Sequence, residues 1–324
     1  MDKSSPLSSL KEKLARHLPL ETSMVWLKKR WLACLGICRQ WRDFVTLARF
    51  DRPIGIYLLL WPTLWGLWLA ADGWPGWHLF LVFTLGCVLT RSAGCVANDL
   101  WDRDFDHRVE RTRERPITTG KITHRQAILF MGLLLLLALA LVLTTNRLTI
   151  YLSLGAVFIA GVYPLMKRIT HMPQAVLGIA FSWGIPMAFA ATQHHIPHTA
   201  WLLVVANLLW TIAYDTQYAM VDREDDLKIG LKSSAILFGD LDKVMVGILQ
   251  AAFVITMLVV GYRFELGFWF HLGLVIATCL MLYQQFLIRE RERNACFRAF
   301  LNNHWAGFAI FLGIVCELYL KTPA

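Results

Sequence analysis

Residues 77–106 read WHLFLVFTLGCVLTRSAGCVANDLWDRDFD, and this stretch decides the fold. Positions 77–97 are predominantly apolar, and about 20 such residues are enough for a helix to cross a bilayer. The apolar run passes directly into a polar segment that carries Asn98, Asp102 and Asp106. The stretch therefore predicts a membrane helix that brings carboxylates to one face of the membrane.

The rest of the chain has the same apolar character. Of its 324 residues, 56% are hydrophobic and only 17% are charged, which is typical of an integral membrane protein. A second apolar run, 200–219, also passes into an acidic segment. We therefore expect an all-α bundle of about nine membrane helices around a central cavity. The expected spans are 53–71, 77–97, 126–145, 148–166, 173–192, 200–219, 243–262, 266–287 and 304–320.

Loop charges predict the orientation, because Lys and Arg accumulate on the cytoplasmic side of membrane proteins. These residues are concentrated in the connections after the second, fourth, sixth and eighth spans, whereas the alternate connections contain only Arg147 and Arg263. We therefore expect the N-terminus and both acidic segments to be cytoplasmic and the C-terminus to lie outside. Acidic Asp2, Glu12 and Glu21 are unlike a mitochondrial transit peptide and favour a bacterial inner membrane.

The chain divides into two regions by composition. Residues 1–48 mix basic residues with Leu and Trp, which predicts a cytoplasmic extension of amphipathic helices on the inner leaflet, and residues 49–324 form the membrane domain. The net charge of +9 comes from cations dispersed among membrane-adjacent loops. We therefore expect the lipid bilayer, and not nucleic acid, as a partner.

Helical geometry selects specific residues from the first acidic segment. At about 100° per residue, Asn98, Asp102 and Asp106 lie on one stripe of a helix. Arg91 lies seven residues before Asn98, within about 20° of it. An arginine inside a span is costly unless it faces a polar cavity, so we expect such a cavity on the side of the carboxylates.

The second acidic segment has the same geometry. Asp215 lies within the sixth span, and Asp222 and Asp226 follow on a stripe about 40° wide. Tyr218 lies four residues before Asp222 and on the same face. Mg²⁺ binds to a few carboxylates together with waters and phosphate oxygens. Two facing stripes therefore predict a site for a metal-bound diphosphate, in which the metal takes up the charge that develops on the leaving group.

Cationic side chains near the cytoplasmic ends of spans are candidate diphosphate ligands. The positive-inside distribution explains many of them equally well, and a single acidic motif can also be a solvated helix end with local ion pairs. Two motifs on the same membrane side argue against that second interpretation. The candidate cations are Arg49, Arg52, Arg111, Arg115, Lys167 and Arg168.

Several short motifs, in order, resemble those of the UbiA-type prenyltransferases, and within them the 4-hydroxybenzoate polyprenyltransferase branch of ubiquinone biosynthesis. The resemblance covers about residues 49–240. The matching stretches are 51–55, 60–65, 93–99, 115–116, 163–168 and 213–222. One departure is Arg52, where the branch is expected to have lysine, which keeps the charge but not the geometry.

The resemblance implies a nine-helix bundle that needs Mg²⁺ and transfers a long prenyl chain from polyprenyl diphosphate to the 3-position of 4-hydroxybenzoate. By this resemblance, Asp222, Asp102 and Arg168 are expected to be catalytic. The implied metal ligands are Asn98, Asp102, Asp106, Asp222 and Asp226. The implied substrate-binding residues are Arg52, Arg91, Asn98, Arg115, Tyr163, Lys167, Asp215 and Tyr218.

Three alternatives belong beside this interpretation. The acceptor can be another aromatic quinone precursor. A CDP-alcohol phosphotransferase also uses paired aspartates on membrane helices, but its Asp-Gly…Ala-Arg…Gly signature is absent. An ion-coupled transporter would use Arg91 and Asp215 as an intramembrane charge relay, although the acidic residues here are concentrated at one mouth of the bundle.

Overall fold

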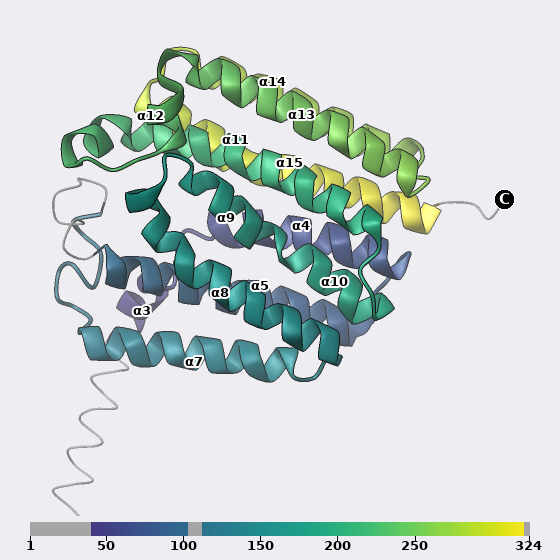
Figure 1. Cartoon of the computed structure of the whole chain (residues 1–324), viewed down its shortest axis with the longest axis horizontal. Helices are drawn as coiled ribbons and strands as arrows, with labels where there is room; N and C mark the ends of the chain where they lie inside the picture. The colour runs from purple at the N-terminus through teal and green to yellow at the C-terminus, as the bar shows by residue number, and fades with distance from the viewer. Residues whose placement is uncertain (1–39, 103–111, 321–324) are drawn as a thin grey trace, which may run out of the picture.

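The computed structural model describes residues 40–102 and 112–320, except for the side chains of Lys167, Arg168 and Ile229. The regular structure of these residues is entirely helical, as the sequence predicts, and Figure 1 shows the long helices lying side by side. The elements are α3 (Trp41–Leu47), α4 (Ile54–Ala71), α5 (Gly76–Trp101), α7 (His124–Val142), α8 (Arg147–Ile169), α9 (Pro173–Ser182), α10 (Gly184–Gln193), α11 (His198–Ile229), α12 (Ser234–Phe238), the 3-10 turn η1 (Gly239–Leu241), α13 (Asp242–Arg263), α14 (Phe268–Ile288) and α15 (Arg293–Leu320).

The outer surface of the bundle is apolar. In the part of the chain that the structure describes, eight helical segments are long and apolar enough to cross a membrane. Their outward faces carry large hydrophobic side chains, such as Leu129 on α7, which is 73% exposed, and Phe158 on α8, which is 72% exposed. Extensive apolar surface of this kind is suited to lipid rather than to water. The protein is therefore a multi-pass membrane protein.

Helix α11 covers the expected span 200–219 but is not one of those eight apolar segments. It packs against α9, α13 and α15, so many of its side chains face protein rather than lipid. Four of its polar side chains have no exposed surface: Asn207, Thr211, Thr216 and Gln217. The helix also continues to Ile229, which places the whole second acidic segment on one continuous helix.

The core joins α4, α11, α13 and α15 through aromatic rings. Trp65 stacks on Trp210 with ring centroids 5.4 Å apart, and Trp210 stacks on Phe253 at 5.9 Å. Each indole also has a hydrogen-bond acceptor, because Trp65 Nε1 donates to the Gly307 carbonyl at 3.1 Å and Trp210 Nε1 donates to Asn303 Oδ1 at 3.0 Å. Trp65 and Trp210 therefore bury apolar surface without leaving their indole N–H groups unsatisfied.

A network of buried amides extends this core towards the second acidic segment. Gln217 and Gln250 both donate to Gln284 Oε1, at 3.2 and 2.8 Å, and Asn303 Nδ2 donates to Gln217 Oε1 at 2.8 Å. Hydrogen bonds between membrane helices hold their relative positions because hydrocarbon offers no competing partner. The network therefore ties α11, one residue before Tyr218, to α13, α14 and α15.

The expected fifth span, 173–192, consists of two short helices, α9 and α10, which meet at Trp183. Pro186 lacks the amide proton that would bond to the carbonyl of Ser182, which accounts for the break. By contrast, α4 continues through Pro62 without interruption.

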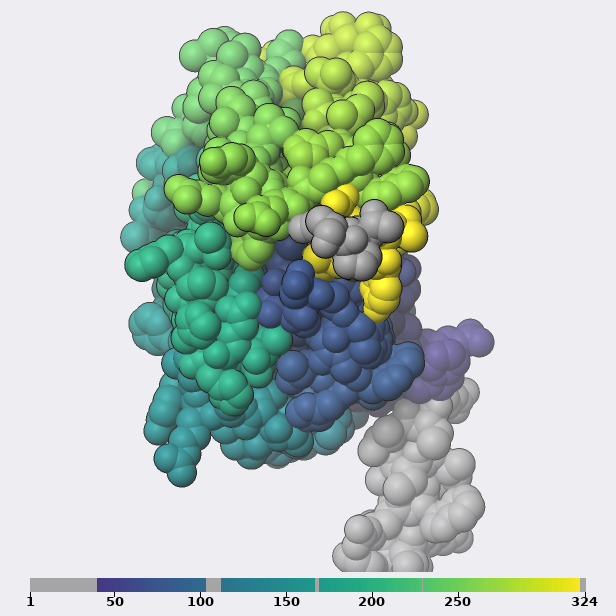
Figure 2. Space-filling model, turned by 90° about the vertical axis from the view of Figure 1, so that its right-hand side faces the viewer, coloured from purple at the N-terminus to yellow at the C-terminus, as the bar shows by residue number. Residues whose placement is uncertain are grey.

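The two acidic segments lie at the same end of the bundle. In Figure 1, α5 and α11 both end on the left, and the C-terminal end of α15 lies on the right. Figure 2 shows that opposite end, where α15 lies next to α4. Near the acidic end, Leu47 of α3 is fully buried in an apolar cluster with Val96 and Ile117. Residues 1–39 of the expected N-terminal extension lie outside the described residues.

Candidate active site

The first acidic segment follows one partly exposed stripe of α5. Arg91, Asn98 and Asp102 each retain some exposed surface, whereas positions 92–93 and 95–96 are buried. Helix α5 runs without a break to Trp101, and the amide of Asp102 closes its end with a 2.9 Å hydrogen bond to the carbonyl of Asn98. The three described residues of the predicted stripe are therefore partly accessible, next to buried positions of the same helix.

The second acidic segment has the same form on α11. Asp215, Tyr218, Asp222 and Asp226 are partly exposed, whereas positions 216–217 between them are fully buried. Because the stripe begins within the expected span and ends beyond it, its polar groups lead from the interior of the bundle to its acidic end. Carboxylates in this arrangement are accessible to a charged ligand without facing lipid.

Arg91 is the cation deepest in these stripes. Its Nη1 donates to Cys95 Sγ at 2.9 Å, and its guanidinium lies 5.7 Å from the ring centroid of Phe181. Its Nε is buried and has no hydrogen-bond partner in the part of the chain that the structure describes. Among the described residues, no carboxylate forms an ion pair with it. A guanidinium whose charge no carboxylate compensates is suited to an anionic ligand, and the role of Arg91 as a substrate ligand stays a prediction.

Aromatic residues and a glycine surround Arg91. Tyr163 of α8 and Tyr214 and Tyr218 of α11 lie within electrostatic range of its guanidinium. A Cβ atom on Gly55 of α4 would lie 2.5 Å from Arg91 Nε, so glycine at this position leaves room for the guanidinium where it lies. Gly55 and Tyr214 were missed as site residues; the signal for Tyr214 was its position one helical turn before Tyr218.

Unlike Arg91, the predicted ligands Arg52, Lys167 and Arg168 have no described contact deep in the bundle. The Arg52 side chain is 75% exposed, with Asp51 Oδ2 3.9 Å from its Nε, so it points to solvent at the start of α4. The side chains of Lys167 and Arg168 lie outside the described residues, although the backbone of both belongs to the last turns of α8. Their contacts with a ligand stay a prediction.

A buried ion pair lies beside the first stripe. Asp99 is 1% exposed and accepts hydrogen bonds from Arg49 Nη2 on both oxygens, at 2.9 and 3.0 Å. Arg115, a predicted substrate ligand, places Nη1 3.0 Å from the same carboxylate. The sequence suggests Arg49 as a diphosphate ligand and does not reveal this cluster, because Arg49 is fifty residues from Asp99 and nothing local marks them as partners. Arg111, another candidate cation, lies outside the described residues. Through its ion pair with Asp99, Arg115 stabilises the C-terminal end of α5.

The oxygen atoms of the two acidic stripes fit a divalent cation such as Mg²⁺ only when a bound diphosphate supplies further oxygens. Among residues 40–102 and 112–320, no three His, Cys, Asp or Glu side chains form a metal site, and Asp106 lies outside the described residues. The described donors are the oxygens of Asn98 and Asp102 on α5 and of Asp222 and Asp226 on α11. Mg²⁺ is usually bound by one or two carboxylates, while waters and phosphate oxygens complete its shell. The oxygen donors therefore fit a metal–diphosphate rather than a metal held by protein alone.

Comparison with known proteins decides the family. The model of the UbiA prenyltransferase family matches residues 59–311. The chain belongs to this family. Among curated relatives of this UbiA-family protein, the 4-hydroxybenzoate octaprenyltransferase of Pseudomonas aeruginosa is 56% identical over 87% of the chain and 95% of the relative. The protein of the same name from Saccharophagus degradans is 57% identical over 85% of the chain and 92% of the relative.

Solved structures support the same fold for this UbiA-family chain. The apo structure of a UbiA homologue from Aeropyrum pernix superimposes with a TM-score of 0.73 at 22% identity, covering 81% of the chain and 97% of that structure. A UbiA homologue from Archaeoglobus fulgidus, bound to GPP and Mg²⁺, gives a TM-score of 0.61 at 21% identity, covering 83% and 99%. The predicted family and enzyme class are confirmed, and the transporter and phosphotransferase alternatives are disfavoured.

Proposed function

We propose that this protein transfers a polyprenyl group from polyprenyl diphosphate to the 3-position of 4-hydroxybenzoate, in a Mg²⁺-dependent reaction that releases diphosphate. The observation that carries the proposal is a pair of partly exposed carboxylate stripes together with Arg91, whose Nε is buried and which has no carboxylate partner among the described residues. Such a site takes a metal-bound diphosphate at its mouth and an anionic group deeper in the bundle. The names of relatives at 56% identity support the same substrates.

The residues of the two stripes have different proposed roles in the reaction. Mg²⁺, when bound, supplies positive charge that stabilises the departing diphosphate. Asn98, Asp102, Asp222 and Asp226 hold the metal–diphosphate, and Arg168 and Lys167 assist from α8. The allylic C–O bond breaks, and its electron pair leaves with diphosphate. The ring carbon next to the phenol then bonds to the allylic carbon, and a base removes the ring proton. Asp222 is the proposed group that orients the phenol or accepts this proton.

Arg91 is proposed to bind the carboxylate of the aromatic acceptor. A carboxylate there would pair with the guanidinium, whose buried Nε lacks a partner among residues 40–102 and 112–320, and charge-assisted hydrogen bonds of this kind are strong when water is excluded. Tyr163 and Tyr218, which lie within electrostatic range of Arg91, are proposed to line the side of the aromatic ring. This arrangement selects an acceptor with an acidic group and distinguishes 4-hydroxybenzoate from uncharged phenols.

The protein is proposed to lie in a bacterial inner membrane, with the acidic end of the bundle facing the cytoplasm. The proposed pathway is ubiquinone biosynthesis.

The proposed reaction is tested by an assay of membranes that contain the protein. The substrates are 4-hydroxybenzoate and polyprenyl diphosphates of several lengths, with Mg²⁺ or with EDTA. Prenylated 4-hydroxybenzoate is expected with Mg²⁺ and none with EDTA. Prenylation of homogentisate or a dihydroxynaphthoate, with no product from 4-hydroxybenzoate, would contradict the proposed acceptor.

Replacing Gly55 with alanine tests the role of Arg91 indirectly. The new Cβ overlaps the guanidinium, so Arg91 must move, and a displacement of about 1 Å at a positioned group costs up to about a hundredfold in rate. We expect the KM for 4-hydroxybenzoate to rise while the KM for polyprenyl diphosphate stays unchanged. The matched control is Gly86→Ala on α5, where a Cβ meets nothing within 4 Å. Equal kinetics for both variants would contradict the packing argument.

A further inference from the structure

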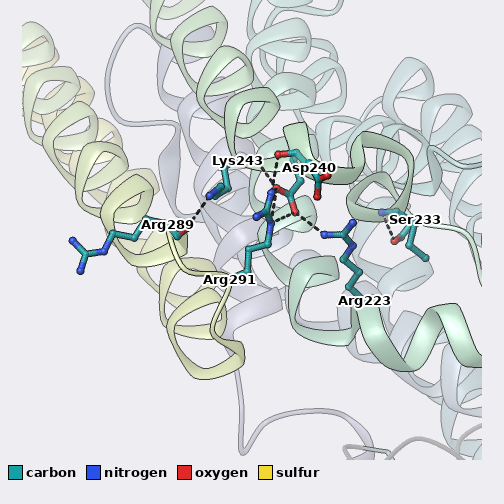
Figure 3. Close-up of polar contacts among 8 residues, drawn as sticks. Arg223, Ser233, Asp240, Lys243, Arg289 and Arg291 are labelled. Carbon is teal, nitrogen blue, oxygen red and sulfur yellow. Dashed lines mark hydrogen bonds and ion pairs between the residues drawn. The ribbon is translucent and has the colours of Figure 1, made fainter.

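A second buried carboxylate lies outside the proposed substrate contacts. Asp242, the first residue of α13, has no exposed surface. Its Oδ1 accepts from Arg291 Nε at 3.0 Å and Nη2 at 2.8 Å, and from the amide of Lys243 at 2.7 Å. Arg223 Nη1 lies 3.5 Å from its other oxygen. Figure 3 shows Arg223 and Arg291 converging on this point from α11 and from the turn between α14 and α15.

Arg291 has an unusual backbone that its contacts stabilise. Its φ is 56°, a left-handed conformation that persists in residues other than glycine when the surroundings hold it. Besides Asp242, its Nη2 donates to the carbonyl of Asp240 at 2.7 Å. The positive-inside distribution accounts for a cation in this turn, but it does not account for a strained arginine bound on a fully buried carboxylate.

The Asp242 cluster holds the part of α11 that carries the second stripe. Arg223 directly follows Asp222, and Asp225 accepts a 2.6 Å hydrogen bond from Arg293 Nη2 at the start of α15. Around a helix, Arg223 and Asp225 lie roughly 160° apart, and Asp222 and Asp226 lie between them. The two ion pairs therefore hold the helix on both sides of the stripe and set its rotation.

The first acidic segment is held in a matching way. Arg49 also has a left-handed backbone, with φ of 60°, and also binds a buried carboxylate, that of Asp99. Arg115 supplies a second cation to Asp99, as Arg223 does to Asp242. Two independent clusters of one left-handed arginine, one buried aspartate and a second arginine thus lie beside the two stripes.

We propose that Asp242 is a positioning residue that sets the rotation of the last turns of α11, and so the placement of Asp222 and Asp226 for a divalent cation. This inference rests on the proposed function of those two carboxylates as ligands of the metal–diphosphate. It assigns Asp242 no contact with substrate. Its loss therefore weakens metal binding and loosens the end of α11, while the bundle remains assembled through its apolar core and its amide network.

The test compares Asp242→Asn with Glu290→Gln in purified protein. Glu290 is in the same turn as Arg291 but pairs only at the surface, with Arg289 at 3.5 Å. Two readouts are independent of catalysis. The first is Mn²⁺ binding in the presence of inorganic diphosphate, measured by electron paramagnetic resonance. The second is hydrogen exchange of the backbone amides of residues 219–229. For Asp242→Asn we expect about 10- to 100-fold weaker Mn²⁺ binding, as for other residues that orient metal ligands, and faster exchange; Glu290→Gln should match the wild type.

Two further variants separate the possible failures. Arg291→Gly keeps the left-handed backbone accessible and removes the guanidinium, so it replaces Asp242→Asn if that variant does not fold, with the same expected result. Asp222→Asn reports on the proposed function itself. Wild-type Mn²⁺ binding in Asp222→Asn would overturn the metal role. Weak binding in Asp222→Asn together with wild-type binding and exchange in the Asp242 or Arg291 variant would overturn the positioning role alone.

Discussion

Asp222→Asn is expected to abolish prenyl transfer, with kcat falling by at least about a hundredfold, while the protein remains in the membrane. The substitution keeps the shape of the side chain and removes its negative charge. Hard cations need such oxygen charges, and loss of one preorganised group that stabilises developing charge typically costs about a hundred- to a thousandfold. The measurement is turnover of 4-hydroxybenzoate under saturating polyprenyl diphosphate and Mg²⁺, normalised to the amount of protein in the membrane.

The matched control is Glu224→Gln in the same acidic segment. Glu224 is exposed and lies on a different face of α11 from Asp222, so its loss removes the same charge without touching the stripe. Turnover close to that of the wild type is expected for this variant. If both substitutions lower activity equally, the general negative charge of the segment matters and the stripe does not.

Arg91→Met is expected to raise the KM for 4-hydroxybenzoate by at least about thirtyfold, with little change in the KM for polyprenyl diphosphate. Methionine fills similar apolar volume but cannot pair with a carboxylate. Removing one partner of a buried charge pair costs about 2 kcal/mol or more, and about 1.4 kcal/mol corresponds to a factor of ten. Initial rates with each substrate varied in turn provide the measurement.

A modified acceptor separates recognition of the carboxylate from loss of packing. 4-Hydroxybenzamide has the same ring and phenol but no negative charge, so the wild type should prefer 4-hydroxybenzoate strongly and Arg91→Met should not. Arg91→Lys should retain part of the preference, because lysine keeps the charge but not the planar fork of donors. An unchanged preference in Arg91→Met would place the acceptor carboxylate elsewhere.

Much of this architecture is predictable because it depends on local pattern. A membrane helix satisfies its backbone hydrogen bonds within itself, so the apolar runs alone predict helices such as α5 and α7. The stripe of Asn98 and Asp102 follows from the helical period. Helix ends are harder to predict: α11 continues past its expected span to Ile229, and α15 begins at Arg293 rather than at 304. Hydropathy marks where a helix leaves lipid, which need not be where the helix ends.

The environment of Arg91 shows where local pattern stops being informative. Its position predicts a polar cavity, but the absence of a carboxylate partner among the described residues depends on which side chains other helices bring near it. Gly55 lies 36 positions away in the sequence, yet its missing side chain makes room for the guanidinium. Steric complementarity of this kind follows only from the packing of α4 against α5.

The sequence by itself determined that this chain is an all-helical membrane protein with two carboxylate stripes, because hydropathy and the helical period act over neighbouring residues. Only the tertiary structure decided what the loop cations do. Arg49, Arg115, Arg223 and Arg291 are compatible in sequence with simple membrane orientation, but the fold brings them onto Asp99 and Asp242. The members of these pairs are separated in the sequence, so no local pattern marks them as partners. How the helices pack decides which of them meet.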